Sequence, residues 1–179
     1  GCHGALNGMR VARGFAESDP NACVLLCAVE VCSLHYHYGW HPERIVANAL
    51  FADGAAAVVG KATNGESNGA WRIADTGSVL VPDSEDAMTW KIGDHGFAMT
   101  LSARVPELIA SHLRGWIEGW LAKNGLKLGD VQSWAVHPGG PRILQSVAAA
   151  LELPDGALDV SRDTLKNYGN MSSPTVLFI

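Results

Sequence analysis

The sequence has few cysteines, no excess of positive charge and no long apolar run. Its four cysteines among 179 residues are too sparse for a fold held together by disulfides. Three of them (Cys23, Cys27 and Cys32) lie in or beside one apolar stretch, which is typical of reduced, buried thiols. The 13 basic residues are outnumbered by 18 acidic ones, so no polybasic stripe is present to bind nucleic-acid phosphates. Charged or polar residues interrupt every apolar stretch before it reaches the roughly 18 residues of a membrane span.

The two ends of the sequence also lack the features of a complete secreted or cytoplasmic chain. Residues 1–4 (Gly-Cys-His-Gly) contain neither the basic nor the apolar region of a signal peptide. The chain has no initiator methionine and ends on the apolar run 175–179, whereas a domain usually ends in a polar tail. We therefore expect a piece of a longer cytoplasmic polypeptide with no nucleic-acid or membrane partner.

What is present predicts a layered α/β protein. The sequence is 47% hydrophobic with 20 glycines, so most of its elements should be buried. Apolar residues at three- and four-residue spacing predict helices, and short apolar runs predict strands. The expected helices are 2–17, a short one opening at 41–44, 105–121 and 141–151. The expected strands are 23–31 (buried on both faces), 55–59, 71–80, 88–101, 131–136 and 175–179. Polar and glycine residues make 62–70 the expected linker, and the alternation of strands and helices gives the fold class.

Cys2 lies at the expected start of the first helix. Unpaired backbone N–H groups and the helix dipole at such a position stabilise a thiolate, so they lower the thiol pKa and make a nucleophile. The same N–H groups could also receive an oxyanion. The alternative is a buried thiol near the start of the chain.

His137 and Asn170 are the two other candidate catalytic side chains. His137 ends an expected strand and is followed by the Pro-Gly-Gly-Pro turn 138–141, the place where open α/β sheets put ligand contacts. Asn170 lies in the polar loop 168–173, and its carboxamide is a hydrogen-bond donor for an oxygen that becomes negative. For both residues, ordinary hydrogen bonding within a turn is the alternative.

A metal site is the weaker interpretation of the cysteines and of the histidines at 35, 37 and 41. Structural zinc sites take their cysteines from exposed turns, whereas Cys23, Cys27 and Cys32 lie in or beside an expected buried strand. We therefore expect no metal. Asp53, in the turn before Gly54, is interpreted as a turn cap rather than as a catalytic acid.

The contexts of these residues carry a resemblance to a known family. The stretches that carry it are Gly1-Cys2 with the glycine-rich helix, 49–57 (Ala-Leu-Phe-Ala-Asp-Gly-Ala-Ala-Ala), 134–141 (Trp-Ala-Val-His-Pro-Gly-Gly-Pro) and 168–173 (Tyr-Gly-Asn-Met-Ser-Ser). The chain resembles the type III polyketide synthases, the chalcone and stilbene synthase family of the thiolase-like superfamily, over about half of a family subunit. The resemblance implies a thiolase-like layered α/β (αβαβα) fold, incomplete at both ends. Residues 1–61 would be the end of its N-terminal half, with the nucleophile helix and two strands, and 62–179 most of its C-terminal half.

The resemblance also implies the chemistry, a decarboxylative condensation of malonyl-CoA onto a cysteine-bound acyl starter. Cys2 would hold the acyl chain as a thioester, and His137 would keep Cys2 ionised. Together with Asn170, His137 would donate hydrogen bonds to the thioester carbonyl of malonyl-CoA. Loss of CO₂ leaves an enolate, whose charge two donors stabilise in the transition state. An acyl-CoA starter and malonyl-CoA are the implied substrates, no further cofactor is implied, and a homodimer is the implied assembly.

The positions of a substrate cavity are likewise implied by the resemblance. Phe51 and Met99 fall on the two gatekeeper positions, with Phe97 on the same strand face as Met99. Further cavity positions fall on Glu30, Cys32, His35 and Ser172, and the loop beside the coenzyme A tunnel falls on Gly139 and Gly140. The glycines would let a ligand approach the backbone closely, while a packed core side chain is the alternative for the aromatic and methionine positions. Cys32, where plant chalcone synthases carry threonine, favours a bacterial-type enzyme.

Two other functions remain open from the sequence. A ketoacyl-acyl-carrier-protein synthase of the priming type shares the Cys-His-Asn set. It would be expected to show His-Gln-Ala-Asn where this chain has His137 followed by Pro-Gly-Gly. The other alternative is an inactive lobe for folding or dimerisation, whose active site needs the other half of a subunit.

Overall fold

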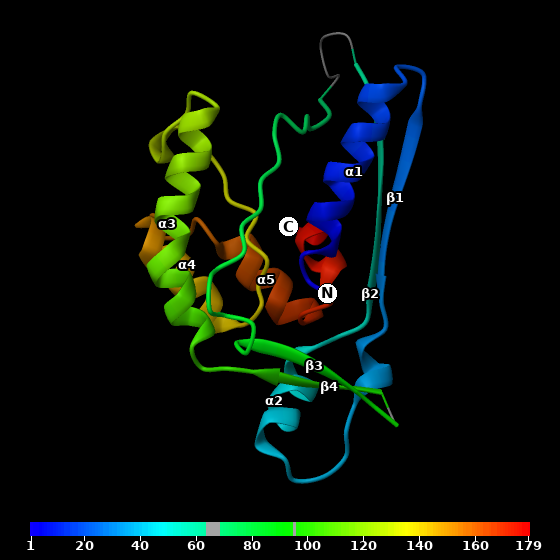
Figure 1. The fold of residues 1–179 in the computed structure, drawn as a ribbon, viewed down its shortest axis with the longest axis vertical. Coiled ribbons are helices and arrows are strands. Elements are labelled where there is room, and N and C mark those ends of the chain that lie inside the picture. The colour runs from blue at the N-terminus through cyan, green and yellow to red at the C-terminus, as the bar shows by residue number, and fades with distance from the viewer. Residues whose placement is uncertain (64–68, 95) are drawn as a thin grey trace.

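The computed structural model describes residues 1–63, 69–94 and 96–179 as helices packed beside two short sheets (Figure 1). The helices are α1 (Gly4–Ser18), α2 (Pro42–Leu50), α3 (Val105–Lys123), α4 (Pro141–Leu151) and α5 (Asp159–Tyr168). The strands are β1 (Cys23–Glu30), β2 (Gly54–Lys61), β3 (Met88–Gly93) and β4 (Gly96–Leu101), and three 3₁₀ turns are η1 (Cys32–His35), η2 (Leu128–Asp130) and η3 (Ser173–Phe178). The α/β class is confirmed, as are the expected helices at α1 to α4 and the expected strands at β1 and β2.

Strands β1 and β2 form an antiparallel pair that α1 covers on one face (Figure 1). Their register runs from Cys23 opposite Lys61 to Glu30 opposite Gly54. Small residues let α1 approach the sheet closely: a Cβ added at Gly8 would lie 2.6 Å from Leu26 Cδ1.

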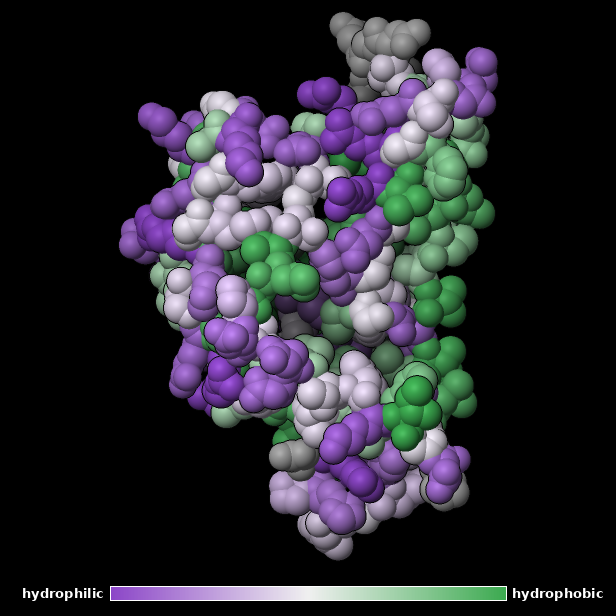
Figure 2. Space-filling view, viewed as in Figure 1, coloured by the Kyte–Doolittle hydropathy of each residue, from purple (hydrophilic) through white to green (hydrophobic). Residues whose placement is uncertain are grey.

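The face of β1 and β2 away from α1 is apolar and exposed. Leu25, Val29 and Val59 are 63%, 64% and 67% exposed, and Figure 2 shows apolar side chains along this edge of the molecule. Cys23 and Cys27 on the same face are free and exposed. The prediction of a strand buried on both faces, with buried thiols, is therefore wrong for this chain, because α1 covers only one side of the sheet.

Residues 88–101 form a hairpin instead of the single expected strand. Strands β3 and β4 pair from Met88 opposite Leu101 to Gly93 opposite Gly96. Gly96 has a φ of +119°, which only glycine adopts readily, so the chain reverses at this point. The hairpin packs against α2 and η1 through β4.

Three other expected strands are absent from the described residues. Residues 71–80 and 131–136 form no strand, because a β-propensity produces a strand only where a neighbour completes the ladder. The run 175–179 lies largely in η3, where the Thr175 N–H and hydroxyl both donate to the carbonyl of Ser172, at 3.3 and 2.8 Å. A short apolar run does not by itself distinguish a strand from a helical turn.

Helices α3 and α4 pack against each other to form the main apolar core. Leu144, Val147 and Leu151 of α4 are buried, with Ile109 and Leu113 of α3 packed against them. Helix α5 is not predicted by apolar periodicity, because its sequence is mostly polar and its buried residues are a serine and a threonine. No helix in the described part of the chain is long and apolar enough to cross a membrane.

Gly54 offers a test of the packing between β2 and the loop that follows α5. A Cβ at Gly54 would lie 2.5 Å from Met171 Sδ and 2.7 Å from Met171 Cβ. Gly54→Ala should therefore lower the free energy of unfolding by about 1–3 kcal/mol, as overpacking does, measured by urea denaturation. Gly60→Ala is the matched control in the same strand, because nothing lies within 4 Å of its Cβ. Equal effects of the two substitutions would contradict this packing.

Candidate active site

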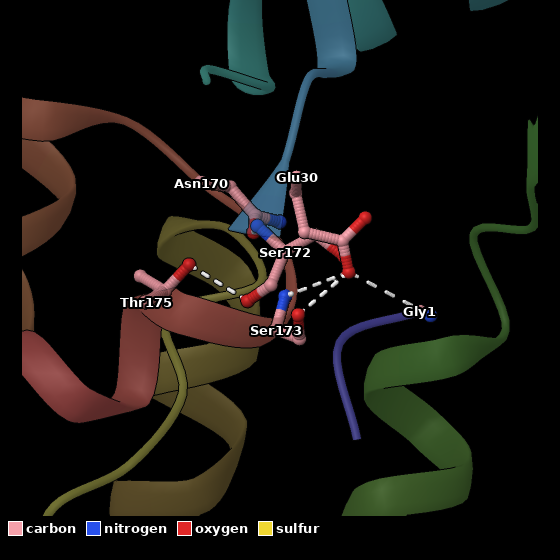
Figure 3. A network of polar contacts seen from close by, with 6 residues as sticks. All are labelled: Gly1, Glu30, Asn170, Ser172, Ser173 and Thr175. Atoms are coloured by element: carbon pink, nitrogen blue, oxygen red, sulfur yellow. Dashed lines mark hydrogen bonds and ion pairs between the residues drawn. The ribbon is translucent and has the colours of Figure 1, made fainter. Parts of the chain in front are cut away.

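A polar network joins the end of β1 to the loop 169–173 and to the start of the chain (Figure 3). Glu30 Oε1 accepts hydrogen bonds from Ser172 Oγ at 3.2 Å, from Ser173 Oγ at 2.7 Å and from the Ser173 N–H at 3.4 Å. Burial raises the pKa of Glu30, but the hydrogen bonds from Ser173 and Ser172 lower it, and the net direction is down. Glu30 is therefore an ionised anchor for the loop.

Cys2 lies immediately before α1, partly buried beside this network. Burial raises the pKa of the Cys2 thiol, which outweighs the lowering effect of the hydrogen bond with the Ser172 side chain. The prediction of a lowered thiol pKa is wrong in this structure, because removal of the thiol from water has a larger effect than the hydrogen bonds that lower the pKa. A reaction at Cys2 consequently needs a base that takes its proton.

Asn170 is fixed by its backbone and by its own side chain. Its N–H donates to the Leu50 carbonyl and its carbonyl accepts from the Ala52 N–H, both at 2.9 Å. Asn170 Oδ1 accepts a hydrogen bond of 2.9 Å from the Ser172 N–H, so the amide is oriented with Nδ2 left to donate. Gly169, at φ +74°, makes this approach possible, since a Cβ there would lie 2.9 Å from Ala52 Cβ.

His137 lies before the glycine turn that leads into α4. Its two ring nitrogens are buried and have no hydrogen-bond partner among the described residues. Burial lowers the pKa of His137 to about 4, so the imidazole is neutral near pH 7. Buried polar atoms are rarely left without a partner, which marks this imidazole as a group available to a ligand.

Two residues, Ser172 and Leu50, lie between the three candidate catalytic residues and connect them. The Ser172 N–H donates to Asn170 Oδ1, and a hydrogen bond with the Ser172 side chain lowers the pKa of the Cys2 thiol. Leu50 accepts the Asn170 N–H, and its side chain lies 3.9 Å from the Cβ position of Gly140, in the turn after His137. Among the described residues no direct hydrogen bond joins the three side chains, so their joint role remains a prediction.

A cavity of about 30 Å³ lies between α2, η1 and the hairpin, with room for about two water molecules. Five of the expected cavity residues line it, namely Cys32, His35, Phe51, Phe97 and Met99. The two other expected residues, Glu30 and Ser172, belong to the adjacent polar network. Phe51 and Met99 therefore share one cavity, as gatekeepers would.

Sequence reasoning missed six lining residues, namely Tyr36, His37, Arg44, Ala47, Asn48 and Trp90. Trp90 is opposite Met99 in the hairpin register, which could be recognised only once the hairpin was known. Arg44 and Asn48 precede Phe51 at helical spacing, so a closer reading of α2 would have placed them on its face.

The cysteines of the alternative zinc site face different surroundings. Cys23 and Cys27 are on the exposed face of the sheet, whereas Cys32 lines the cavity. Burial, with the charges of Glu30 and Asp53, raises the pKa of Cys32 to about 11, so it is a neutral thiol. In the described ranges no group of three His, Cys, Asp or Glu side chains is placed to hold a metal ion.

Asp53 serves as a structural acceptor beside the cavity. It accepts hydrogen bonds from the Ser33 N–H at 2.8 Å and from the Ser33 hydroxyl at 2.7 Å. It therefore holds η1 against the turn before β2, which agrees with a capping role.

Comparison with protein families divides the chain into two matching regions. Residues 73–179 match the model of the C-terminal domain of chalcone and stilbene synthases. Residues 1–78 match the model of 3-oxoacyl-[acyl-carrier-protein] synthase III.

Individual relatives cover the chain almost completely. It is 41% identical to 1,3,6,8-tetrahydroxynaphthalene synthase of Streptomyces peucetius subsp. caesius over 99% of its length and 48% of the relative. It is 34% identical to type III polyketide synthase C of Arabidopsis thaliana, over 100% of this chain and 48% of the relative. The chain thus spans about half the length of these curated relatives.

Solved structures give the same result for the fold. PKS-I from the brown alga Ectocarpus siliculosus superposes with a TM-score of 0.95 at 36% identity, over 99% of this chain and 47% of that one. The 1,3,6,8-tetrahydroxynaphthalene synthase of Streptomyces coelicolor A3(2) superposes with a TM-score of 0.89 at 32% identity. The match covers 99% of this chain and 50% of that one. The expected thiolase-like α/β fold is confirmed.

Burial of His137 predicts a stability that depends on pH. The folded-state pKa is about 4, whereas an unfolded histidine titrates near 6.5. Below about pH 6.5 the unfolded chain binds a proton that the folded chain does not, so this histidine lowers the free energy of unfolding progressively as the pH falls toward 4. The full effect is about 3 kcal/mol, and His137→Gln should remove it.

The measurement is the difference between the unfolding free energies at pH 7 and pH 4.5, obtained from urea titrations. His112→Gln, at an exposed position on α3, is the matched control and should keep the parent difference. An unchanged difference in His137→Gln would show that the imidazole is not held neutral.

Proposed function

The chain belongs to the chalcone and stilbene synthase family, and we propose that it forms part of a polyketide synthase that condenses malonyl-CoA with an acyl group on Cys2. The observation that carries the proposal is His137, whose two buried ring nitrogens have no partner among the described residues, in a turn connected to Asn170 through Leu50. A buried imidazole without a partner costs stability, and a substrate that bonds to it offsets that cost.

The first proposed step loads the starter acyl group. Neutral His137 takes the proton from Cys2, which the raised thiol pKa makes necessary. The sulfur then attacks the acyl-CoA carbonyl carbon, the bond from that carbon to the coenzyme A sulfur breaks, and the leaving thiolate takes the proton back from His137. The products are an acyl group on Cys2, free coenzyme A and a neutral imidazole ready for the next step.

The second proposed step generates and uses the carbon nucleophile. The malonyl thioester oxygen accepts hydrogen bonds from an N–H of His137 and from Asn170 Nδ2. The bond to the carboxylate breaks, CO₂ leaves, and its electron pair forms an enolate at that oxygen, where both donors stabilise it. The enolate carbon attacks the acyl carbonyl and expels the Cys2 thiolate, which lengthens the chain by two carbons without a separate base.

The proposal extends to the surroundings of the site. Gly139 and Gly140 would let the coenzyme A arm approach the backbone, and Phe51 and Met99 would be the gatekeepers between the coenzyme A tunnel and the substrate cavity. The substrates are coenzyme A thioesters with no resident cofactor, and the assembly is a cytoplasmic homodimer. Residues 1–61 would end the N-terminal half of the subunit, and 62–179 would make up most of the C-terminal half.

The choice of thioester tests the proposal against its nearest rival. A priming ketoacyl synthase would need malonyl carried on acyl carrier protein, whereas the proposed enzyme extends starters with malonyl-CoA alone. The Pro-Gly-Gly sequence after His137 supports the polyketide assignment. Absence of any turnover with malonyl-CoA in a polypeptide of full family length would instead favour an inactive lobe.

Cys2→Ala in such a polypeptide should abolish chain extension, because no thioester can form. It should retain measurable malonyl-CoA decarboxylation, because both proposed donors are intact. Liquid chromatography of products, with release of labelled CO₂, measures the two activities separately. Cys23→Ala, on the exposed sheet face, is the matched control. Extension by Cys2→Ala at the parent rate would refute the assignment of the nucleophile.

Asn170→Ala should slow decarboxylation more than starter loading, because its donor acts on the enolate oxygen. Loss of one such donor typically costs about 10²–10³-fold in rate, and we expect a deficit of that size in CO₂ release. Acylation of Cys2 by the starter, followed by mass spectrometry, should fall by less than about tenfold on the same scale. Equal losses in the two steps would mean that Asn170 supports the fold of the loop only.

A further inference from the structure

Helix α5 has a buried face that is polar. Ser161 is 0% exposed, and Thr164, about one turn later on the same helix, is 4% exposed. Burial of a hydroxyl costs free energy unless the hydroxyl takes part in a hydrogen bond. The partner of the Ser161 hydroxyl therefore indicates what this face of the helix does.

Ser161 is hydrogen-bonded to the segment that carries His137. Its Oγ accepts the Val136 N–H at 3.3 Å, and Val136 immediately precedes His137. Residues 131–136 form no strand in the described ranges, so the Ser161 hydroxyl gives this N–H the partner that a neighbouring strand would otherwise supply. A side chain of α5 thus holds the backbone next to the imidazole.

The other end of α5 leads directly to Asn170. The helix ends at Tyr168, the Gly169 N–H donates to the Leu165 carbonyl at 3.0 Å, and Asn170 follows. At a rise of about 1.5 Å per residue, Ser161 and Tyr168 lie about 10 Å apart along the helix. The internal hydrogen bonds of the helix keep this separation constant.

The start of α5 is fixed in the main apolar core. Leu158, which precedes the helix, is 1% exposed and belongs to the buried cluster of α4. Trp134 and Val136 pack against the same cluster. Because such cores are close-packed, the helix cannot shift relative to the segment before His137 without opening this core.

We propose that Ser161 is a positioning residue that sets the distance between His137 and Asn170. This inference rests on the proposed function, in which both residues donate hydrogen bonds to one thioester oxygen. Two donors stabilise the enolate together only when both reach the same oxygen atom. One helix is bonded through Ser161 to the backbone beside the first donor and leads into the second, so the two donors keep a fixed spacing.

Ser161→Ala in a polypeptide of full family length that contains this chain tests the proposal. We expect kcat for malonyl-CoA decarboxylation to fall by about tenfold or more, because a small misplacement of a catalytic group is costly. KM should stay within about twofold of the parent, because the donors act on charge that develops in the transition state. Ser161→Thr, which keeps the hydroxyl, should restore most of kcat. Release of labelled CO₂ measures the rate.

A double-mutant cycle with Asn170→Ala separates positioning from a general loss of structure. Without the Asn170 donor, the thioester oxygen has to meet only His137, and the spacing between the donors no longer matters. In that background Ser161→Ala should therefore lower kcat by less than about twofold. A purely structural role predicts instead that the two losses multiply.

Two further variants control for stability. Leu121 is buried on α3, and in the described chain the cluster against which Val136 packs does not include it. Leu121→Ala should lower the melting temperature and leave kcat within about twofold of the parent. Ser161→Cys replaces the oxygen with a weaker acceptor of similar shape. Its kcat should lie between those of the parent and Ser161→Ala, and it provides the same cycle if Ser161→Ala does not fold.

The outcomes distinguish the two levels of the proposal. The inference alone is overturned if the parent releases CO₂ and Ser161→Ala keeps the parent kcat, or if Ser161→Ala lowers kcat equally with and without Asn170. A Ser161→Thr variant no faster than Ser161→Ala overturns it as well. A parent that neither decarboxylates malonyl-CoA nor extends any starter overturns the proposed function itself.

Discussion

The structure depends on one carboxylate, that of Glu30 at the end of β1. Its Oε1 accepts hydrogen bonds from Ser172 and Ser173, residues more than 140 positions away in the chain. These bonds hold the loop 169–173 against the end of β1 (Figure 3). Without them the loop would lose its side-chain bonds to β1 and keep its backbone bonds to residues 50–52 and to α5.

The second constraint is the end of α2, which serves both the site and the cavity. The Leu50 carbonyl accepts the Asn170 N–H, and the Leu50 side chain lies 3.9 Å from the Cβ position of Gly140 in the glycine turn. The next residue, Phe51, pairs with Asn170 as an isolated parallel bridge and also lines the cavity. A single helix end therefore positions both a candidate catalytic residue and a cavity-lining residue. Glycine is needed at position 169 because a Cβ there would lie 2.9 Å from Ala52 Cβ.

Sequence patterns predicted the helices that have their own apolar stripe or turn signal. They failed for strands, which form only when a neighbouring strand pairs with them. The apolar stripe of α3 and the glycine turn before α4 sufficed to place these helices. By contrast, β-propensity predicted strands at residues 71–80 and 131–136. Propensity does not say whether a neighbouring strand is present to form hydrogen bonds with them. The catalytic candidates stood out because glycine turns flank them. His37 and Trp90 did not, because their position in the cavity follows from side-chain clamps and hairpin register that arise only on folding.

The central claim is that Cys2, rather than another thiol, carries the acyl chain beside His137 and Asn170. The most direct test is to incubate a full-length polypeptide containing this chain with an acyl-CoA starter and no malonyl-CoA, then to locate the acyl group by peptide mass spectrometry. The account predicts a thioester on Cys2, with little on Cys32, whose pKa of about 11 keeps it protonated. Acylation of Cys32 in preference to Cys2, or of neither, would contradict it.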